Sequence, residues 1–121
     1  MTLLAKLIAQ EEGFFRSGTL PARNHNPGDL RHSPHSEHAA DAPDAIGVID
    51  TDADGWEDLE RQLQLDAERT FTLGTAIYSW APVKDGNQPW KYLADVIEGF
   101  AAAGHKVYST DSLSEVLKIQ A

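Results

Sequence analysis

Two adjacent glutamates, Glu11 and Glu12, stand at the end of an amphipathic segment near the start of this 121-residue chain. Leucine and isoleucine recur at helical spacing through residues 2–12, and Gly13 follows, which predicts a helix that ends at the glycine. A carboxyl group crowded by apolar neighbours loses solvation in its charged form, so its pKa rises and it can donate a proton near neutral pH. Cleavage of a glycosidic bond needs a proton donor of this kind.

Helical spacing alone favours Glu11 over Glu12 as the buried acid. At about 100° per residue, Glu11 falls near the centre of the apolar stripe and Glu12 falls toward its edge. The plain alternative is that both side chains are solvated, as most glutamates near helix ends are. Phe14 and Phe15 follow directly and favour the more crowded environment.

Length and composition limit the classes of protein that fit. The chain suits one domain with a single modest core, and we expect residues 1–121 to form it. Ten basic residues against 19 acidic ones give a formal net charge of −9, which argues against broad electrostatic binding to nucleic acid or to an anionic membrane. There is no cysteine, so disulfides and thiolate chemistry are excluded.

The sequence shows neither a membrane-spanning segment nor a signal peptide. No stretch approaches the roughly 18 apolar residues of a membrane span. The N-terminus lacks the basic start and apolar core of a signal peptide. If the target lies outside the cytoplasm, we therefore expect another factor to deliver the protein.

Most of the chain is predicted to be helical, with one irregular stretch at residues 16–45. That stretch holds four of the six prolines and four of the five histidines, and it shows little periodicity. Residues 30–32 and 46–51 have enough apolar and β-branched character for a small hairpin. The three tryptophans fit core positions on the predicted helices. These helices run from a cap at Thr51 or a following aspartate to about Arg69, from Thr72 to Pro82, from Pro89 to Gly104, and from a capping box at Ser112 and Glu115.

Short motifs in a fixed order carry more information than any single residue. They are Glu12-Gly13-Phe14, Pro21-Ala22-Arg23-Asn24-His25-Asn26-Pro27-Gly28-Asp29-Leu30-Arg31, Gly55-Trp56, Leu59-Glu60-Arg61-Gln62-Leu63, Tyr78-Ser79-Trp80-Ala81-Pro82, Asn87 and Tyr92. Together they resemble the phage and prophage-encoded lysozyme-like proteins of lytic transglycosylase type, and the resemblance covers about residues 3–97. The chain departs from the family pattern at His25 and Asp29, where the family usually has asparagine.

The resemblance implies a mainly α (α+β) domain of lysozyme-like architecture, in which a small β-hairpin or loop lobe beside the helical core forms one wall of a cleft. It implies cleavage of peptidoglycan between N-acetylmuramic acid and N-acetylglucosamine, and its motif selects Glu12 over Glu11. Glu12 would protonate the bridging oxygen and then act as base on the muramic C6 hydroxyl, which gives a 1,6-anhydro product. A second carboxylate would permit hydrolysis, and Asp29 and Asp50 are the candidates.

The resemblance also implies a set of sugar-binding residues. They are Asn24, Asn26, Tyr78, Asn87 and Tyr92. The structural alternative for the two asparagines is a tight turn before Pro-Gly, because asparagine side chains bond to nearby backbone. The alternative for the tyrosines is helix packing with the hydroxyl group reaching water.

The histidine-rich loop invites a metal interpretation. His25, His32, His35 and His38 lie within fourteen residues of a loop that also holds Glu37 and Asp41, and imidazole with carboxylate suits zinc. The spacing lacks the tight ligand pairs of structural zinc sites, so we expect a solvated loop, no metal and no cofactor. No glycine-rich loop shows a phosphate-binding pattern, which argues against a nucleotide.

Two other functional classes remain compatible with these residues. One is a non-catalytic phage structural or cell-wall-binding protein that retains the lysozyme-like fold, with other virion or tail components as partners. The other is a cytoplasmic regulator that binds metal through the histidine loop. For the enzyme, the resemblance implies a phage or prophage protein that is virion-associated or is released to the cell wall by another factor.

Overall fold

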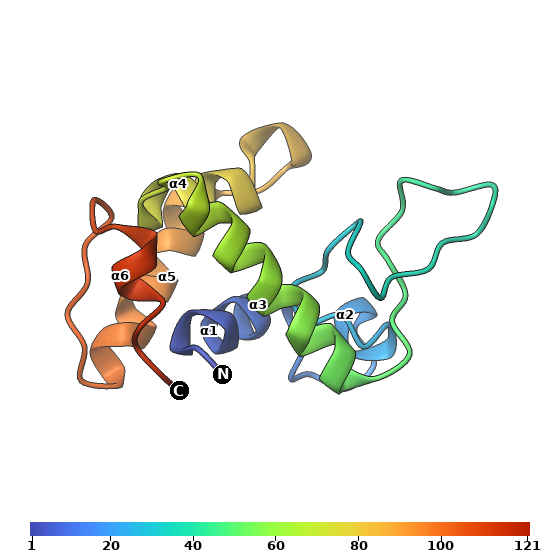
Figure 1. The fold of residues 1–121 in the computed structure, drawn as a ribbon, viewed down its shortest axis with the longest axis horizontal. Coiled ribbons are helices and arrows are strands. Elements are labelled where there is room, and N and C mark those ends of the chain that lie inside the picture. Colours follow the sequence, from blue (N-terminus) through green and yellow to red (C-terminus); the bar gives the residue numbers. More distant parts are fainter.

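The computed structural model describes all residues 1–121 and is mainly α-helical. A long helix, α3, crosses the molecule and connects a group of helices at one end to a loop-rich lobe at the other (Figure 1). No helix has both the length and the apolar character needed to cross a membrane. The elements are α1 (Leu3–Glu12), α2 (Leu20–Arg23), α3 (Asp52–Glu68), α4 (Leu73–Trp80), the 3-10 helix η1 (Val83–Asp85), α5 (Pro89–Ala102) and α6 (Leu113–Val116).

The hydrophobic core lies where α1, α3, α4, α5 and α6 meet. Each helix turns one apolar face inward, as its spacing of leucine, isoleucine and valine predicts. The largest fully buried apolar side chains are Phe100, Leu4, Ile8, Ile49, Leu59, Leu63, Leu73, Ile77, Leu113 and Val96. Trp56 and Trp80 pack against this core, whereas Trp90 is 55% exposed, so its predicted core position is wrong.

Most helix ends form where local sequence signals predict them. The Thr51 hydroxyl accepts from the backbone N–H of Asp54 and begins α3. Thr72 and Thr75 form a complete capping box at the start of α4. The capping box predicted at Ser112 does not form, because the Ser112 hydroxyl bonds to Ser114 and the Glu115 carboxylate accepts from Lys118 instead.

The loop-rich lobe contains α2 and the irregular segment 24–51, drawn in blue to green in Figure 1. The predicted hairpin between residues 30–32 and 46–51 does not form as strands. Gly47 N–H donates to the Leu30 carbonyl at 2.9 Å, but the neighbouring Arg31 carbonyl bonds to the His38 ring, so the ladder does not continue. A single antiparallel bridge between Glu37 and Val48 is the β-structure that remains in the lobe.

Candidate active site

Glu12 occupies the last position of α1, where the helix end is fixed by two backbone bonds. Gly13 adopts a left-handed conformation with φ of 84°, which glycine accepts without steric cost. Its N–H donates to the Gln10 carbonyl and Phe14 N–H donates to the Ala9 carbonyl, the bonding pattern of a Schellman motif. The predicted glycine stop therefore holds the Glu12 backbone in a defined place.

The Glu12 carboxyl group is held by a tyrosine from α5. The Tyr92 hydroxyl donates to Oε2 of Glu12 at 2.7 Å. Burial raises the pKa of Glu12 from 4.5 to about 7; the Tyr92 bond opposes this shift, and the charges of Asp29 and Glu11 add to it. At neutral pH the protonated and ionised forms of Glu12 are therefore present in comparable amounts.

Glu12 opens into a cleft of about 700 Å³ between the loop-rich lobe and the helices. The lobe contributes backbone and side chains from the Asn-Pro-Gly turn, and the opposite wall comes from α3, from the end of α4 and from η1. The lining is mainly polar, which suits a hydroxyl-rich ligand. Its residues are Glu12, Gly28, Asp29, Leu30, Arg31, Ile46, Gln62, Asp66, Arg69, Ser79, Trp80, Ala81, Pro82, Lys84, Asp85 and Asn87.

The turn at Pro27-Gly28 packs closely on the helices that form the other wall. A Cβ atom at Gly28 would lie 3.0 Å from Cδ1 of Leu59 and 3.1 Å from Cζ2 of Trp80. A larger residue would push the turn away from these side chains. Gly28 therefore sets how near the lobe comes to Trp80 at the edge of the cleft.

Asp29 brings a second carboxyl group into the cleft. Its backbone is left-handed with φ of 52°, a conformation that aspartate and asparagine tolerate better than most residues. Its Oδ1 atom is buried and has no hydrogen-bond partner. Burial raises the pKa of Asp29, and the positive charge of Arg31 opposes that shift.

Asn26 supports the cleft from behind and does not face it. Its side chain is fully buried and donates to the carbonyls of Leu30 and Gly47, while its Oδ1 accepts from Leu30 N–H. Asn24 ends α2 and does not line the cleft. The expected sugar contact of Asn26 is thus corrected to a structural role, because its polar side-chain atoms bond to backbone groups of the lobe.

The other three predicted contact residues divide in the same way. Asn87 lines the cleft, and its side chain donates to the Pro82 carbonyl at 3.3 Å. Tyr92 bonds to Glu12 but does not itself line the cleft. Tyr78 is 47% exposed on α4 and does not line the cleft. The predicted sugar contact is therefore corrected, because this side chain faces solvent.

The competing acids lie elsewhere. Glu11 is next to Asp95 and Lys91 of α5, and burial followed by the Asp95 charge raises its pKa. It does not line the cleft, and neither does the exposed Asp50. Of the four carboxyl groups considered for the reaction, the structure brings together Glu12 and Asp29.

Sequence reasoning missed the polar stripe that α3 presents to the cleft. Gln62, Asp66 and Arg69 follow one another at i, i+4 and i+7, a spacing that aligns them on one helix face. Asp66 is buried and accepts from Gln62 at 3.1 Å, and burial raises its pKa. This spacing was available from the sequence, but it resembles an ordinary solvated helix face until Glu12 is known to lie across from it.

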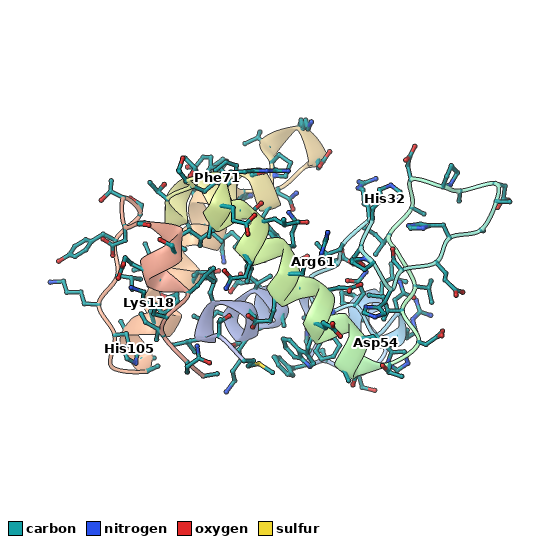
Figure 2. The ribbon with its side chains drawn as sticks, in the orientation of Figure 1. His32, Asp54, Arg61, Phe71, His105 and Lys118 are labelled. Atoms are coloured by element: carbon teal, nitrogen blue, oxygen red, sulfur yellow. The ribbon has the colours of Figure 1, made fainter.

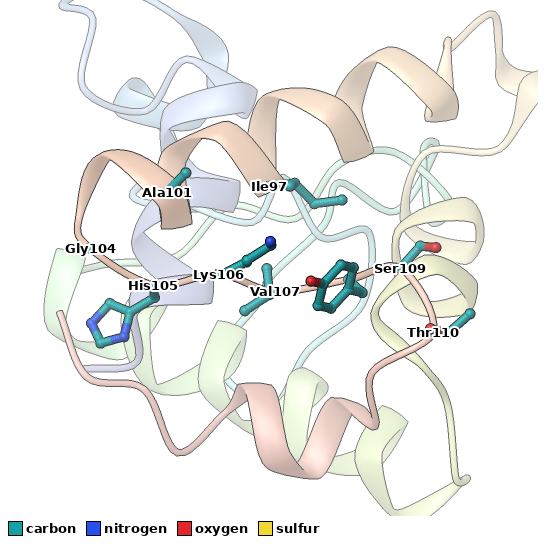
Figure 3. A pocket seen from close by; sticks show the side chains of 9 residues that line it. Ile97, Ala101, Gly104, His105, Lys106, Val107, Ser109 and Thr110 are labelled. Carbon is teal, nitrogen blue, oxygen red and sulfur yellow. The ribbon is translucent and has the colours of Figure 1, made fainter.

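A second hollow, of about 790 Å³, lies between α5 and the segment that leads to α6 (Figure 3). His105, in its wall, lies at the opposite end of the molecule from His32 and Asp54 (Figure 2). Its lining contains no carboxylate, so it offers no acid–base pair comparable to the one at Glu12.

Comparison of the chain with known protein families, with curated proteins and with solved structures gives no match.

Proposed function

We propose that this protein cleaves the glycan strands of peptidoglycan between N-acetylmuramic acid and N-acetylglucosamine, with Glu12 as general acid and base. The observation that carries the proposal is the Glu12 carboxyl group, whose pKa is about 7, at the wall of a polar cleft. A catalytic pKa near the working pH is the condition for efficient proton transfer in both directions. The proposal includes a lysozyme-like architecture, with the loop-rich lobe as one wall of the substrate cleft.

The reaction requires Glu12 in its protonated form first. The carboxyl group gives its proton to the oxygen that links the two sugars, and the bond from that oxygen to C1 of the muramic residue breaks. The carboxylate then takes a proton from the C6 hydroxyl as that oxygen bonds to C1, which gives the 1,6-anhydro product and restores the acid. The Tyr92 hydroxyl, 2.7 Å from Glu12, stabilises the carboxylate between the two steps.

The rest of the cleft supplies groups suited to this polymer. Asn87 and Gln62 offer amide groups to sugar hydroxyl and acetamido groups, and Trp80 offers an apolar ring surface. Arg31 and Arg69 provide positive charge for the carboxylates of the attached peptide. These positive charges in the cleft allow a chain of net negative charge to bind an acidic polymer.

A second carboxylate would direct the reaction toward hydrolysis. Besides Glu12, two carboxyl groups in the cleft have a pKa that burial raises. They belong to Asp29 and Asp66. In the hydrolytic variant one of them activates a water molecule or stabilises the sugar cation. The mass of the released product separates the two routes, because the anhydro product is lighter by one water.

A non-catalytic wall-binding or virion structural protein is the second candidate. Of the five residues expected to contact sugar, only Asn87 lines the cleft, and this favours the non-catalytic candidate. In that case the cleft binds glycan without turnover, and other virion or tail components are the partners. In either case we propose that a virion or another factor brings the protein to the cell wall.

The test is digestion of purified peptidoglycan, with mass analysis of the soluble fragments. We expect the wild type to release anhydro fragments and Glu12→Gln to be slower by about 10²–10⁴-fold, the usual size of a general acid–base contribution. Glu11→Gln is the matched control, since it makes the same change one residue away and should retain activity. Loss of activity in Glu11→Gln alone would contradict the assignment of Glu12. A wild type that sediments with the wall but releases nothing would identify the binding protein instead.

A further inference from the structure

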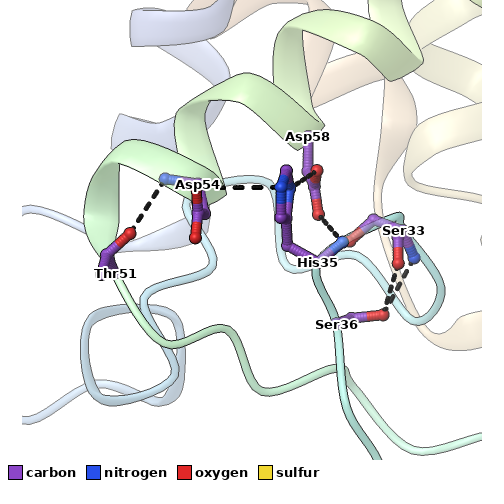
Figure 4. Close-up of polar contacts among 6 residues, drawn as sticks. All are labelled: Ser33, His35, Ser36, Thr51, Asp54 and Asp58. Atoms are coloured by element: carbon purple, nitrogen blue, oxygen red, sulfur yellow. Dashed lines mark hydrogen bonds and ion pairs between the residues drawn. The ribbon is translucent and has the colours of Figure 1, made fainter.

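Outside the cleft, one histidine of the loop-rich lobe meets a cluster of carboxylates on α3. His35 lies beside Asp54 and Asp58, and Figure 4 shows its ring between these two side chains. Glu57 belongs to the same helical turns, and one ligand atom each from His35, Asp54 and Glu57 lies within 4.8 Å of the other two. The cluster is thus built from two separate parts of the chain.

Asp58 fixes the orientation of His35 through two bonds. The backbone N–H of His35 donates to Oδ2 of Asp58 at 2.9 Å, and ring Nδ1 lies 2.6 Å from Oδ1. The Asp58 side chain is 1% exposed. A carboxylate accepts at both of these contacts, so the Nδ1 atom of His35 carries the proton.

This tautomer leaves the other ring nitrogen directed at the remaining acids. Nε2 of His35 is 3.8 Å from Oδ1 of Asp54. The backbone of Asp54 is held in turn by the Thr51 cap, which accepts its N–H at 3.2 Å. A carboxylate that binds one ring nitrogen while the other faces further ligands is the arrangement that orients metal-binding histidines in proteins.

We propose that His35, Asp54 and Glu57 bind one divalent transition-metal ion of the zinc type, with Asp58 as the positioning residue. One imidazole nitrogen with two carboxylate oxygens suits zinc, whereas calcium and magnesium prefer oxygen ligands alone. Zinc bonds of about 2.0–2.2 Å place neighbouring ligand atoms about 3.3–3.6 Å apart in a tetrahedron. The 3.8 Å separation of Nε2 and Asp54 needs only a small closure, and water completes the coordination at this half-exposed site.

The site differs from the metal interpretation of the histidine-rich loop. His32 has a single nearby carboxylate, Asp44, at 3.4 Å. His25 has Asp52 at 2.7 Å, and the His38 ring bonds to a backbone carbonyl. The expectation of no metal considered ligands within the loop, but the acids of the proposed site come from α3. This proposal is independent of the reaction at Glu12.

The first measurement is equilibrium dialysis of the untagged, metal-free protein against Zn²⁺, followed by competition with a chromophoric zinc chelator. We expect one ion per chain, and at least a tenfold loss of affinity in Asp54→Asn and in Glu57→Gln. Both variants leave the Asp58 clamp intact, so they should remain folded. His32→Gln is the matched control for a loop histidine and should bind zinc as the wild type does.

Long-range ¹⁵N–¹H NMR of the histidine rings tests the geometry separately. Zinc should shift the Nε2 resonance of His35 and leave its Nδ1 protonated. Absence of zinc binding by the wild type would overturn the proposal. Equal losses in His32→Gln and Asp54→Asn, or a zinc-dependent shift at Nδ1, would overturn it as well.

Discussion

The Tyr92 hydroxyl donates a 2.7 Å hydrogen bond to Glu12 and so connects α5 to the last residue of α1. The bond pulls the pKa of Glu12 downward, against the larger effect of burial. Tyr92 thereby sets how strong an acid Glu12 is, in addition to where it lies. Its removal should change the pH dependence of any reaction that Glu12 performs.

Tyr92→Phe should move the alkaline fall in kcat/KM to higher pH. A general acid acts in its protonated form, so the wild-type kcat/KM should fall above a pH of about 7, the pKa of Glu12. Without the hydroxyl, the carboxylate loses a donor and its pKa rises further. The maximal rate should fall roughly tenfold, the value of a hydrogen bond to a charged group. The measurement is kcat/KM on soluble glycan fragments across pH.

Tyr78→Phe provides the control for the loss of a hydroxyl group. Tyr78 is exposed and lies outside the cleft, so its pH profile should match that of the wild type. An unchanged profile in Tyr92→Phe would mean that Glu12 is not the group titrating in the reaction.

Asp29→Asn should move the same alkaline fall in the opposite direction. The Asp29 charge raises the pKa of Glu12, so a neutral amide should lower that pKa and shift the fall to lower pH. Asparagine tolerates the left-handed backbone at this position, which keeps the turn intact. Asp50→Asn is the charge-matched control outside the cleft. A shift to higher pH in Asp29→Asn would contradict the proposed interaction between the two carboxyl groups.

The helices could be predicted because their signals are local. Thr51, Thr72 and Pro89 begin helices as their types indicate, and Gly13 ends α1. The form of the lobe could not be predicted in this way, because distant partners decide it. The single backbone bond from Gly47 to Leu30 is too little for a hairpin.

The candidate site shows the same division between local and distant signals. The motif selected Glu12, whereas helical spacing favoured Glu11 as the more buried acid. Spacing describes burial against the apolar face of α1 itself, but Glu12 is enclosed by Tyr92 of α5 and faces Asp29 of the lobe. Periodicity within one helix therefore does not contain the contacts that enclose Glu12.

Asn26→Ala should destabilise the protein by roughly 2 to 4 kcal/mol, because three hydrogen bonds are lost in a buried turn at about 1 kcal/mol each. The lost partners are Leu30 N–H and the carbonyls of Leu30 and Gly47. Urea unfolding followed by circular dichroism measures the difference. Asn24→Ala, which removes an asparagine two residues away, should cost less than about 1 kcal/mol. Equal losses in both variants would show that the turn does not depend on Asn26.

Glu12→Gln should stabilise the protein at alkaline pH while it slows the proposed reaction. Folding raises the pKa of Glu12 from 4.5 to about 7, so the unfolded chain binds fewer protons than the folded one between these values. The free energy of unfolding therefore falls as pH rises through this window and stays low above it.

Glutamine at position 12 does not ionise, so the Glu12→Gln variant does not lose this stability. The gain should approach roughly 3 kcal/mol near pH 8, because the pKa rises from 4.5 to about 7 at about 1.4 kcal/mol per pKa unit, and it should vanish near pH 4. Urea unfolding at both pH values measures it, and the exposed Glu98→Gln should differ from wild type by the same small amount at each. If Glu12→Gln were no more stable than wild type near pH 8, the carboxyl group would not be desolvated, and its role as a neutral-pH acid would fail with it.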